Sequence, residues 1–397
     1  MYDESIIADL ILKRNYKGCF DYLSNIFNEN NISWDYIIKN HKDHRWLLTN
    51  ILEVMYYTSN MSLGTQICDL IFLNAWLGNQ PMYNFRRIIP RLNKLKVEDN
   101  VSDYKEWNPC NPSICHKYDK TGYFILQRLV NFSSERATNY VSHSEDRLFK
   151  TRNILMTTDS NFKILSQVEV KDESNRIIYP KHVQGLEDMQ IFHINEKKRK
   201  HKRLGFFCTL VDCQPSGIPQ IGFGLLTISN GVVSKVHTLD SGDKNRCEKN
   251  WLPYYDNGLK LLYSGSNMER YRFKVDDPML HLEGKSEYCN KLRDVRGSGS
   301  PIPFDGGFLI LFHEVIFMED KGTYKRTYIH RFVKTDRLFQ VLQISNFFTF
   351  ENCDIEFARS IIWDLEMCNI LIGVGIEDHN SYLYTIDPNV IRDLLIF

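Results

Sequence analysis

Five short polar clusters recur between residues 108 and 390, and each is followed by a run of strand-forming residues. The clusters are Asn111–Ile114, Glu187–Gln190, Glu248–Trp251, Arg296–Pro301 and Ile355–Ala358. The runs that follow are rich in aromatic and branched side chains and are bounded by turn residues, which is typical of β-strands. A chain with this pattern must arrange several similar β units, each with its polar segment in an equivalent place.

The spacing of the clusters is roughly 50–75 residues, which is enough for one four-stranded propeller blade with a variable loop. A polar segment that faces a central axis, followed by a buried strand, is the inner strand pair of such a blade. A β-sandwich also contains many short strands, but it does not require a polar cluster at the start of each repeat. We therefore predict a mainly β chain in which residues 96–397 form a five-bladed β-propeller.

Residues 1–95 have a different pattern, in which apolar side chains recur at three- and four-residue spacing. Ile6, Ile7, Leu10 and Ile11 form one such stripe. The pattern predicts four or five short antiparallel helices that make up a small, helical-repeat-like N-terminal domain. Two interpretations remain open for this domain, namely a packing role alone or a surface that binds a protein partner.

The charge balance argues against partners that require a strong electrostatic field. The chain contains 49 Lys and Arg residues and 49 Asp and Glu residues, so its formal net charge is zero. Such a chain has no overall attraction to nucleic acid or to an anionic membrane. The one dense basic run, Lys197–Arg203, lies inside the second unit, where a solvated hairpin loop is favoured over a nucleic-acid patch. No apolar run reaches the roughly 18–20 residues of a membrane helix.

The ten cysteines are scattered and do not show the spacing of a disulfide framework or a zinc site. We therefore expect reduced thiols and a cytoplasmic location. No phosphate-binding loop and no Ser or Cys triad signature is present, and no ligand cluster indicates a metal. We predict no bound cofactor, although inorganic phosphate or a nucleotide sugar could serve as a co-substrate.

The five clusters, taken in order, resemble the blade signatures of glycoside hydrolase family 130, the mannoside phosphorylases and hydrolases, and of related mannosyltransferases. The matching segments are Asn111-Pro112 with the strand Tyr123–Arg128, Gly185–Gln190, Lys249–Pro253, Gly299–Pro301 with Asp305 and His313, and Gly373–Asp378. Each motif alone is weak, and their shared order strengthens the resemblance. The chain also resembles propeller domains encoded with bacterial and viral glycosyltransferases, which share Glu248–Trp251 and His330–Phe332.

The resemblance implies an active site at the central mouth of the propeller, with Asp188 as the catalytic general acid. It also implies that Arg128, Lys249 and His313 hold phosphate or a nucleotide diphosphate, and Arg296 can add a further donor. The candidate sugar-binding residues are Glu187, Asn250, Trp251, Glu356, Glu377 and Asp378. Structural alternatives stay open: Asp188 as a turn residue, Arg128 in an inter-blade ion pair, His313 as a core histidine and Trp251 as a blade-packing aromatic.

One departure from the family pattern bears on the reaction. The Pro-Arg that follows Glu-Asp in the family is Met189-Gln190 here, and that Arg is one of the family's phosphate contacts. We expect an inverting glycosyltransferase or glycoside phosphorylase that acts on mannose-like sugars, with hydrolysis less favoured. The alternatives are a non-catalytic glycan-binding module that partners a glycosyltransferase, and a scaffold propeller that uses only its rims.

Overall fold

The structure is a computed structural model of the chain. It describes residues 2–396 apart from 14, 41–43, 45–46, 49–50, 52–53, 56–86, 89–92, 99–105, 136–138, 195–202, 243–245, 257, 265–266, 276, 287–294, 321–322, 346 and 352. Most of the basic run that begins at Lys197 lies outside the described residues. None of the described helices is both long enough and apolar enough to cross a membrane.

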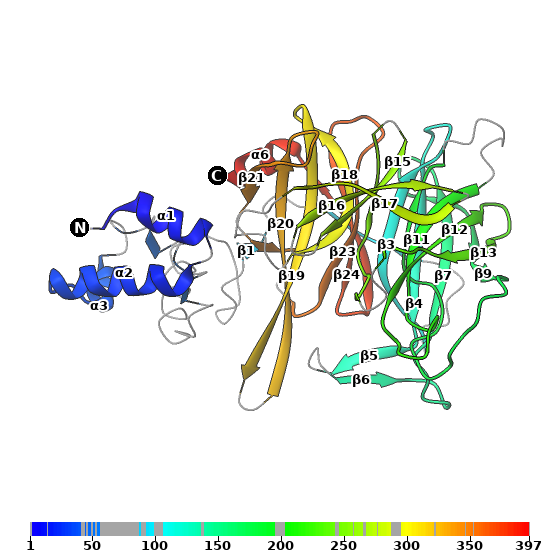
Figure 1. The fold of residues 1–397 in the computed structure, drawn as a ribbon, viewed down its shortest axis with the longest axis horizontal. Coiled ribbons are helices and arrows are strands. Elements are labelled where there is room, and N and C mark those ends of the chain that lie inside the picture. Colours follow the sequence, from blue (N-terminus) through cyan, green and yellow to red (C-terminus); the bar gives the residue numbers. More distant parts are fainter. Residues whose placement is uncertain are drawn as a thin grey trace.

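The described strands form five sheets of four or more strands, which are the blades of the predicted propeller (Figure 1). Blade one is β3 (Asn108–His116), β4 (Tyr123–Val130), β7 (Thr151–Thr158) and β8 (Ile164–Glu169). Blade two is β10 (Glu187–Phe192), β11 (Arg203–Leu210), β12 (Gln220–Thr227) and β13 (Val232–Thr238), with β9 (Lys171–Asp172) parallel to β13. Blade three is β14 (Leu252–Tyr255), β15 (Leu259–Ser264), β16 (Met268–Lys274) and β17 (Asp277–Ser286).

Blades four and five complete the ring. Blade four is β18 (Arg296–Phe304), β19 (Gly307–Asp320) and β20 (Thr323–Thr335), joined by β21 (Val341–Ser345), β22 (Phe348–Thr349), β26 (Leu395–Ile396) and β1 (Arg87–Ile88). Blade five is β23 (Glu356–Trp363), β24 (Ile370–Ile376), β25 (Asn380–Ile386) and β2 (Asn93–Lys96). A separate hairpin, β5 (Phe132–Glu135) and β6 (Asn139–Ser142), follows β4.

The five polar clusters mark the innermost strands, as predicted. Four of them coincide with the start of β3, β10, β18 or β23, and the fifth directly precedes β14. Neighbouring innermost strands are in contact, because β3 packs against β10 and β23, and β18 packs against β14 and β23. The second strand of blade one, β4, is buried along its whole length, as expected for a strand enclosed by its own sheet and the adjacent blades.

The ring is closed by a strand from the N-terminal side of the propeller. β2 pairs antiparallel with β25 and forms the outer edge of blade five, and β1 pairs parallel with β22. Both strands begin before residue 96, and both pair with strands of the propeller blades. The four residues of β2 are all exposed and include two lysines, so the strand has no hydrophobic alternation by which sequence could reveal it.

Three N-terminal helices confirm the helical character of the first segment. They are α1 (Glu4–Leu12), α2 (Tyr16–Glu29) and α3 (Trp34–Lys39). Asp3, Asn15 and Ser33 cap them by accepting backbone N–H bonds. They share their own apolar core and lie beside the sheets, on the side of α6 (Pro388–Leu394) in Figure 1. The helices predicted between residues 56 and 86 fall outside the described residues.

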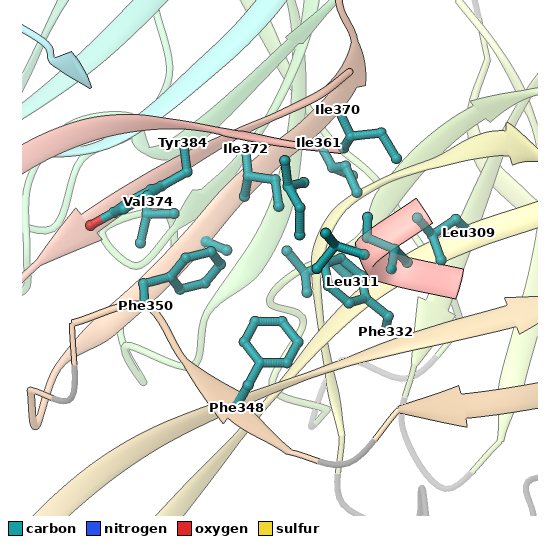
Figure 2. Packing of buried hydrophobic residues seen from close by; sticks show 14 of the residues in the cluster. Leu309, Leu311, Phe332, Phe348, Phe350, Ile361, Ile370, Ile372, Val374 and Tyr384 are labelled. Carbon is teal, nitrogen blue, oxygen red and sulfur yellow. The ribbon is translucent and has the colours of Figure 1, made fainter. Parts of the chain in front are cut away.

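A large apolar cluster joins blades four and five (Figure 2). Phe332 and Phe348 of blade four stack at a centroid distance of 4.9 Å, and they share the cluster with Ile361 and Ile372 of blade five. Such a cluster fixes the angle between the blades, and therefore the positions of the polar residues at their inner ends.

Candidate functional site

A cavity of about 380 Å³ lies among the inner ends of all five blades. Its lining includes these predicted residues: Arg128, Glu187, Asp188, Lys249, Asn250, Arg296, His313 and Asp378. It also includes residues that were not among the predicted site residues: Asn111, Phe132, Tyr140, Phe149, Val183, Val211, Pro219, Arg326, Tyr328, Ile355 and Phe357. The volume lies within the range of small-molecule sites.

Three cavity residues have left-handed backbone conformations at the inner ends of consecutive blades. Asn111, Asp188 and Asn250 have φ values of 47°, 48° and 62°. Asn and Asp tolerate this region better than most residues, and non-glycine residues in it concentrate at functional sites. Glu377 and Asp378, in the turn between β24 and β25, have φ values of 54° and 52°. This backbone geometry sets where the polar side chains of the cavity point.

Asp188 is the centre of a buried hydrogen-bond network. Its Oδ1 accepts a bond from Arg128 Nη1 at 2.6 Å and another from Asn111 Nδ2 at 2.9 Å. Arg359, on β23, donates from Nε to the Asp188 carbonyl oxygen at 2.8 Å. Blades one, two and five therefore hold this residue together, and its carboxylate has a fixed orientation.

The same network determines the charge of Asp188. Burial alone would raise the pKa of the carboxyl group, but Arg128, Arg359 and the Asn111 amide outweigh burial and lower the pKa below its ordinary value. Asp188 is therefore ionised at neutral pH in the free protein. The general-acid role expected of Asp188 would require a proton on this carboxylate, which the network disfavours in the free protein.

Asp378 is a third carboxyl group in the cavity, beside Glu187 and Asp188, and its environment differs from that of Asp188. It lies in the turn after β24 and is partly buried. Burial raises its pKa to about 6, although Arg128 acts in the opposite direction. The two aspartates therefore have pKa values shifted in opposite directions, which sequence could not show.

Four cationic residues line the cavity. Arg128 is already paired with Asp188, and it also lies 3.7 Å from Glu187 Oε1. Lys249 Nζ lies 3.4 Å from the same Glu187 oxygen, and this attraction contributes most to its raised pKa. Arg296 has an exposed side chain on the cavity wall, and Arg326 adds a cation from β20. Together they form a suitable site for a phosphate-bearing ligand.

His313 lines the cavity as a neutral group. Its Nδ1 lies 3.0 Å from Ser298 Oγ, and its ring is almost fully buried. Burial, and then the nearby charges of His330, Arg296 and Arg359, lower its pKa well below the ordinary value. His313 can therefore exchange hydrogen bonds with a ligand but carries no positive charge, unlike the cationic contact expected.

Two hairpins meet at the cavity. Arg326 of β20 donates to the Tyr140 hydroxyl of β6 at 2.5 Å, and its guanidinium lies 5.0 Å from the centre of the Tyr140 ring. Tyr140 and Phe149 both contact Phe132 edge-to-face, at 5.3 and 5.4 Å between ring centroids. Figure 1 shows the β5–β6 and β19–β20 hairpins projecting from the same end of the propeller. They give the cavity one aromatic wall.

Three predicted sugar-binding residues lie outside the cavity lining. Trp251 is 2% exposed and packs against Tyr263 and Tyr271 at 4.7 and 5.0 Å, so it has the alternative blade-packing position. Glu356 is buried and accepts backbone N–H bonds from Phe350, Glu351 and Cys353. Glu377 likewise accepts from the N–H groups of Asp354 and Ile355. Packing or backbone bonds occupy the side chains of all three, and the structure places none of them in the cavity lining.

The departure at Met189-Gln190 is part of an inter-blade contact. Met189 is buried in the core of blade two. Gln190 Nε2 donates to Ser300 Oγ at 2.9 Å, and Gln190 Oε1 accepts from Arg359 Nη1 at 3.2 Å. Arg359 thus places a buried cation behind Asp188, but it does not line the cavity. Within the described residues, no group of three or more His, Cys, Asp or Glu side chains is arranged to hold a metal ion.

Comparison with solved structures identifies similar folds. The structure matches a β-1,2-mannobiose phosphorylase from Listeria innocua with a TM-score of 0.51 and 11% identity, over 76% of this chain and 99% of that one. It matches a GDP-Man-dependent mannosyltransferase from Leishmania mexicana with a TM-score of 0.50 and 12% identity, over 76% and 90%. No protein-family model and no curated protein sequence matches the chain. The resemblance found in the sequence is therefore confirmed at the level of the fold.

Proposed function

We propose that this protein is a carbohydrate-active enzyme that acts on mannose-like sugars in the central cavity. The observation that carries the proposal is the convergence of Arg128, Asp188, Lys249, Arg296 and Asp378, which come from five different blades, on that cavity. The two structures that share the fold act on mannosides or transfer mannose, according to their names. We propose mannose-containing substrates for this protein on that basis.

The residues of the cavity suit chemistry at an anomeric carbon. A glycosyl group develops positive charge at this carbon in the transition state, and an ionised carboxylate such as Asp188 stabilises it. The departing or attacking phosphate is negative and needs several convergent donors. Cationic donors are supplied by Lys249, Arg296 and Arg326. Arg128, in contrast, already donates a hydrogen bond to Asp188.

The geometry favours transfer from an activated sugar over phosphorolysis. A phosphate or diphosphate leaving group departs without being protonated, so transfer does not require Asp188 to be an acid. Gln190 replaces a family phosphate ligand and is bonded to Ser300 and Arg359, which removes one contact that inorganic phosphate would use. We therefore assign an inverting glycosyl transfer as the principal reaction, with donors that carry a sugar phosphate bond.

A charge variant at the cavity wall tests the proposal. We expect Arg296→Gln to raise the donor KM by about 10- to 100-fold, because a charge-assisted hydrogen bond to phosphate is lost. GDP-mannose and mannose 1-phosphate are the donors, mannose is the acceptor, and disaccharide and released phosphate or GDP are measured. Arg272→Gln is the matched control, since Arg272 is exposed on β16 and absent from the cavity lining.

Two outcomes would count against the proposed enzyme. Saturable binding of mannosides without turnover of any donor would support the glycan-binding module instead. Equal donor KM values for Arg296→Gln, Arg272→Gln and the unchanged protein would place the phosphate away from this cavity wall.

A further inference from the structure

The turn between β24 and β25 presents a carboxyl group whose bonding contrasts with that of Asp188. Asp378 lines the cavity, and its backbone is in the left-handed region, with φ of 52°. Within the part of the chain that the structure describes, no hydrogen bond to the Asp378 carboxyl group is found, whereas Asp188 accepts two. The Asp378 carboxyl group is therefore open to a ligand.

Asp378 faces charged groups from several elements. Arg128 on β4, Asp188 on β10 and Arg326 on β20 act on it electrostatically, together with the adjacent Glu377. Asp378 in turn acts on Cys110, Tyr140 and Tyr328. The innermost strand of blade one contacts those of blades five and two, so Arg128 comes from the blade between the two aspartates. This order places two carboxyl groups in one cavity with a shared guanidinium.

We propose that Asp378 exchanges the proton with the glycosidic oxygen, while Asp188 remains ionised and stabilises positive charge at the anomeric carbon. This assignment rests on the proposed function. In transfer, an acceptor hydroxyl attacks the anomeric carbon as the bond to the phosphate oxygen breaks. The phosphate keeps the bonding electron pair, and the hydroxyl proton passes to Asp378. In the reverse reaction Asp378 returns that proton to the glycosidic oxygen as phosphate attacks.

The difference in pKa between the two aspartates, in the cavity that both line, supports this division of roles. Burial, with smaller contributions from Asp188 and Glu377, raises the pKa of Asp378 to about 6, whereas the pKa of Asp188 is lowered. A group with a pKa near the working pH can both accept and donate a proton. Pairs of carboxyl groups whose environments separate their pKa values commonly divide acid–base and electrostatic roles in this way.

The pH dependence of the two reaction directions tests the assignment. We expect kcat/KM for transfer to rise as pH increases through about 6, because Asp378 must be ionised to accept a proton. The kcat/KM for the phosphorolytic direction must fall as pH increases through the same range, because Asp378 must be protonated to donate a proton. Asp378→Asn is expected to remove both inflections and to lower kcat by about 10²- to 10⁴-fold, the usual contribution of a general acid or base. Asp378→Glu should restore an inflection, and the exposed Asp119→Asn is the control.

A second readout requires no turnover. Infrared difference spectra of the free protein between pH 5 and pH 8 should show loss of a protonated carboxyl band, and Asp378→Asn should lack that change. If the band change persists in Asp378→Asn, the proton is on another residue and the inference is overturned. If the unchanged protein turns over substrate and Asp378→Asn keeps both pH inflections, the role of Asp378 is overturned but the proposed function is not. A complete absence of turnover in the unchanged protein overturns the proposed function and this assignment together.

Discussion

Replacing Asp188 by Asn is expected to lower the rate of sugar transfer about a thousandfold. The substitution keeps the shape of the side chain but removes the negative charge that we propose stabilises the anomeric carbon. Electrostatic stabilisation of this kind commonly contributes about 10²- to 10³-fold to a rate. Arg359 still bonds to the main-chain oxygen of residue 188, so the backbone position should be retained. Steady-state kinetics with a nucleotide sugar donor measure the effect.

The same variant also reports on Asp378. The negative charge of Asp188 raises the pKa of Asp378, so its removal should move the pH inflection of the residual activity to lower pH. Asp119→Asn, an equivalent change in an exposed turn, should leave both rate and inflection unchanged. Equal turnover by Asp188→Asn and the unchanged protein would show that Asp188 has no catalytic role.

Replacing Arg128 by Met is expected to lower the free energy of unfolding by about 3–5 kcal/mol at neutral pH, because one member of a buried ion pair is left without its partner. Arg128 is 6% exposed and Asp188 is 8% exposed. Asn111 still donates to the carboxylate, but a neutral amide does not replace a guanidinium. The difference in unfolding free energy is measured by urea denaturation, with the same dependence of free energy on urea concentration fitted for both proteins.

The pH dependence of this loss has a defined sign. In the unchanged protein the pKa of Asp188 is lowered on folding, so the pair stabilises the protein above the ordinary Asp pKa of about 3.9 and less below it. Without Arg128, burial favours the protonated form of Asp188. The difference in unfolding free energy should therefore be largest near pH 7 and shrink as pH falls toward about 4.

Two further variants distinguish the stability lost with the ion pair from the stability lost through substitution of any arginine. Arg128→Met combined with Asp188→Asn should recover part of the lost stability, because no unpaired charge remains. Arg272→Met changes an exposed arginine and should alter stability by no more than about 0.5 kcal/mol. A loss for Arg128→Met that is the same at pH 7 and pH 4 would contradict an origin in the Asp188 charge.

The blades could be identified from the amino-acid sequence because each combines a polar start with a hydrophobic strand. Residues near those starts, including Lys249 and Arg296, could therefore be placed near the propeller axis from their sequence positions alone. Trp251 follows Lys249 and Asn250 in sequence, but its side chain packs into the blade core. Asn250 has a left-handed backbone conformation, so the chain turns between Lys249 and Trp251 and their proximity in sequence does not imply a shared site.

Other features depend on contacts between distant segments. Arg128 and Asp188 are 60 residues apart, and the attraction across their 2.6 Å bond lowers the pKa of Asp188. Tyr140 and Arg326 are 186 residues apart and come from hairpins that extend beyond the repeating strand pattern. The β2 strand is exposed and short, and only its pairing with β25 shows that it closes the ring. No local periodicity encodes any of these contacts.

A crystal structure of the protein soaked with mannose and inorganic phosphate would test the central claim most directly. We predict that the phosphate contacts Lys249 and Arg296 and that the sugar lies within hydrogen-bonding distance of Asp188 and Asp378. Ligands bound only outside the central cavity, at concentrations that support turnover, would contradict it.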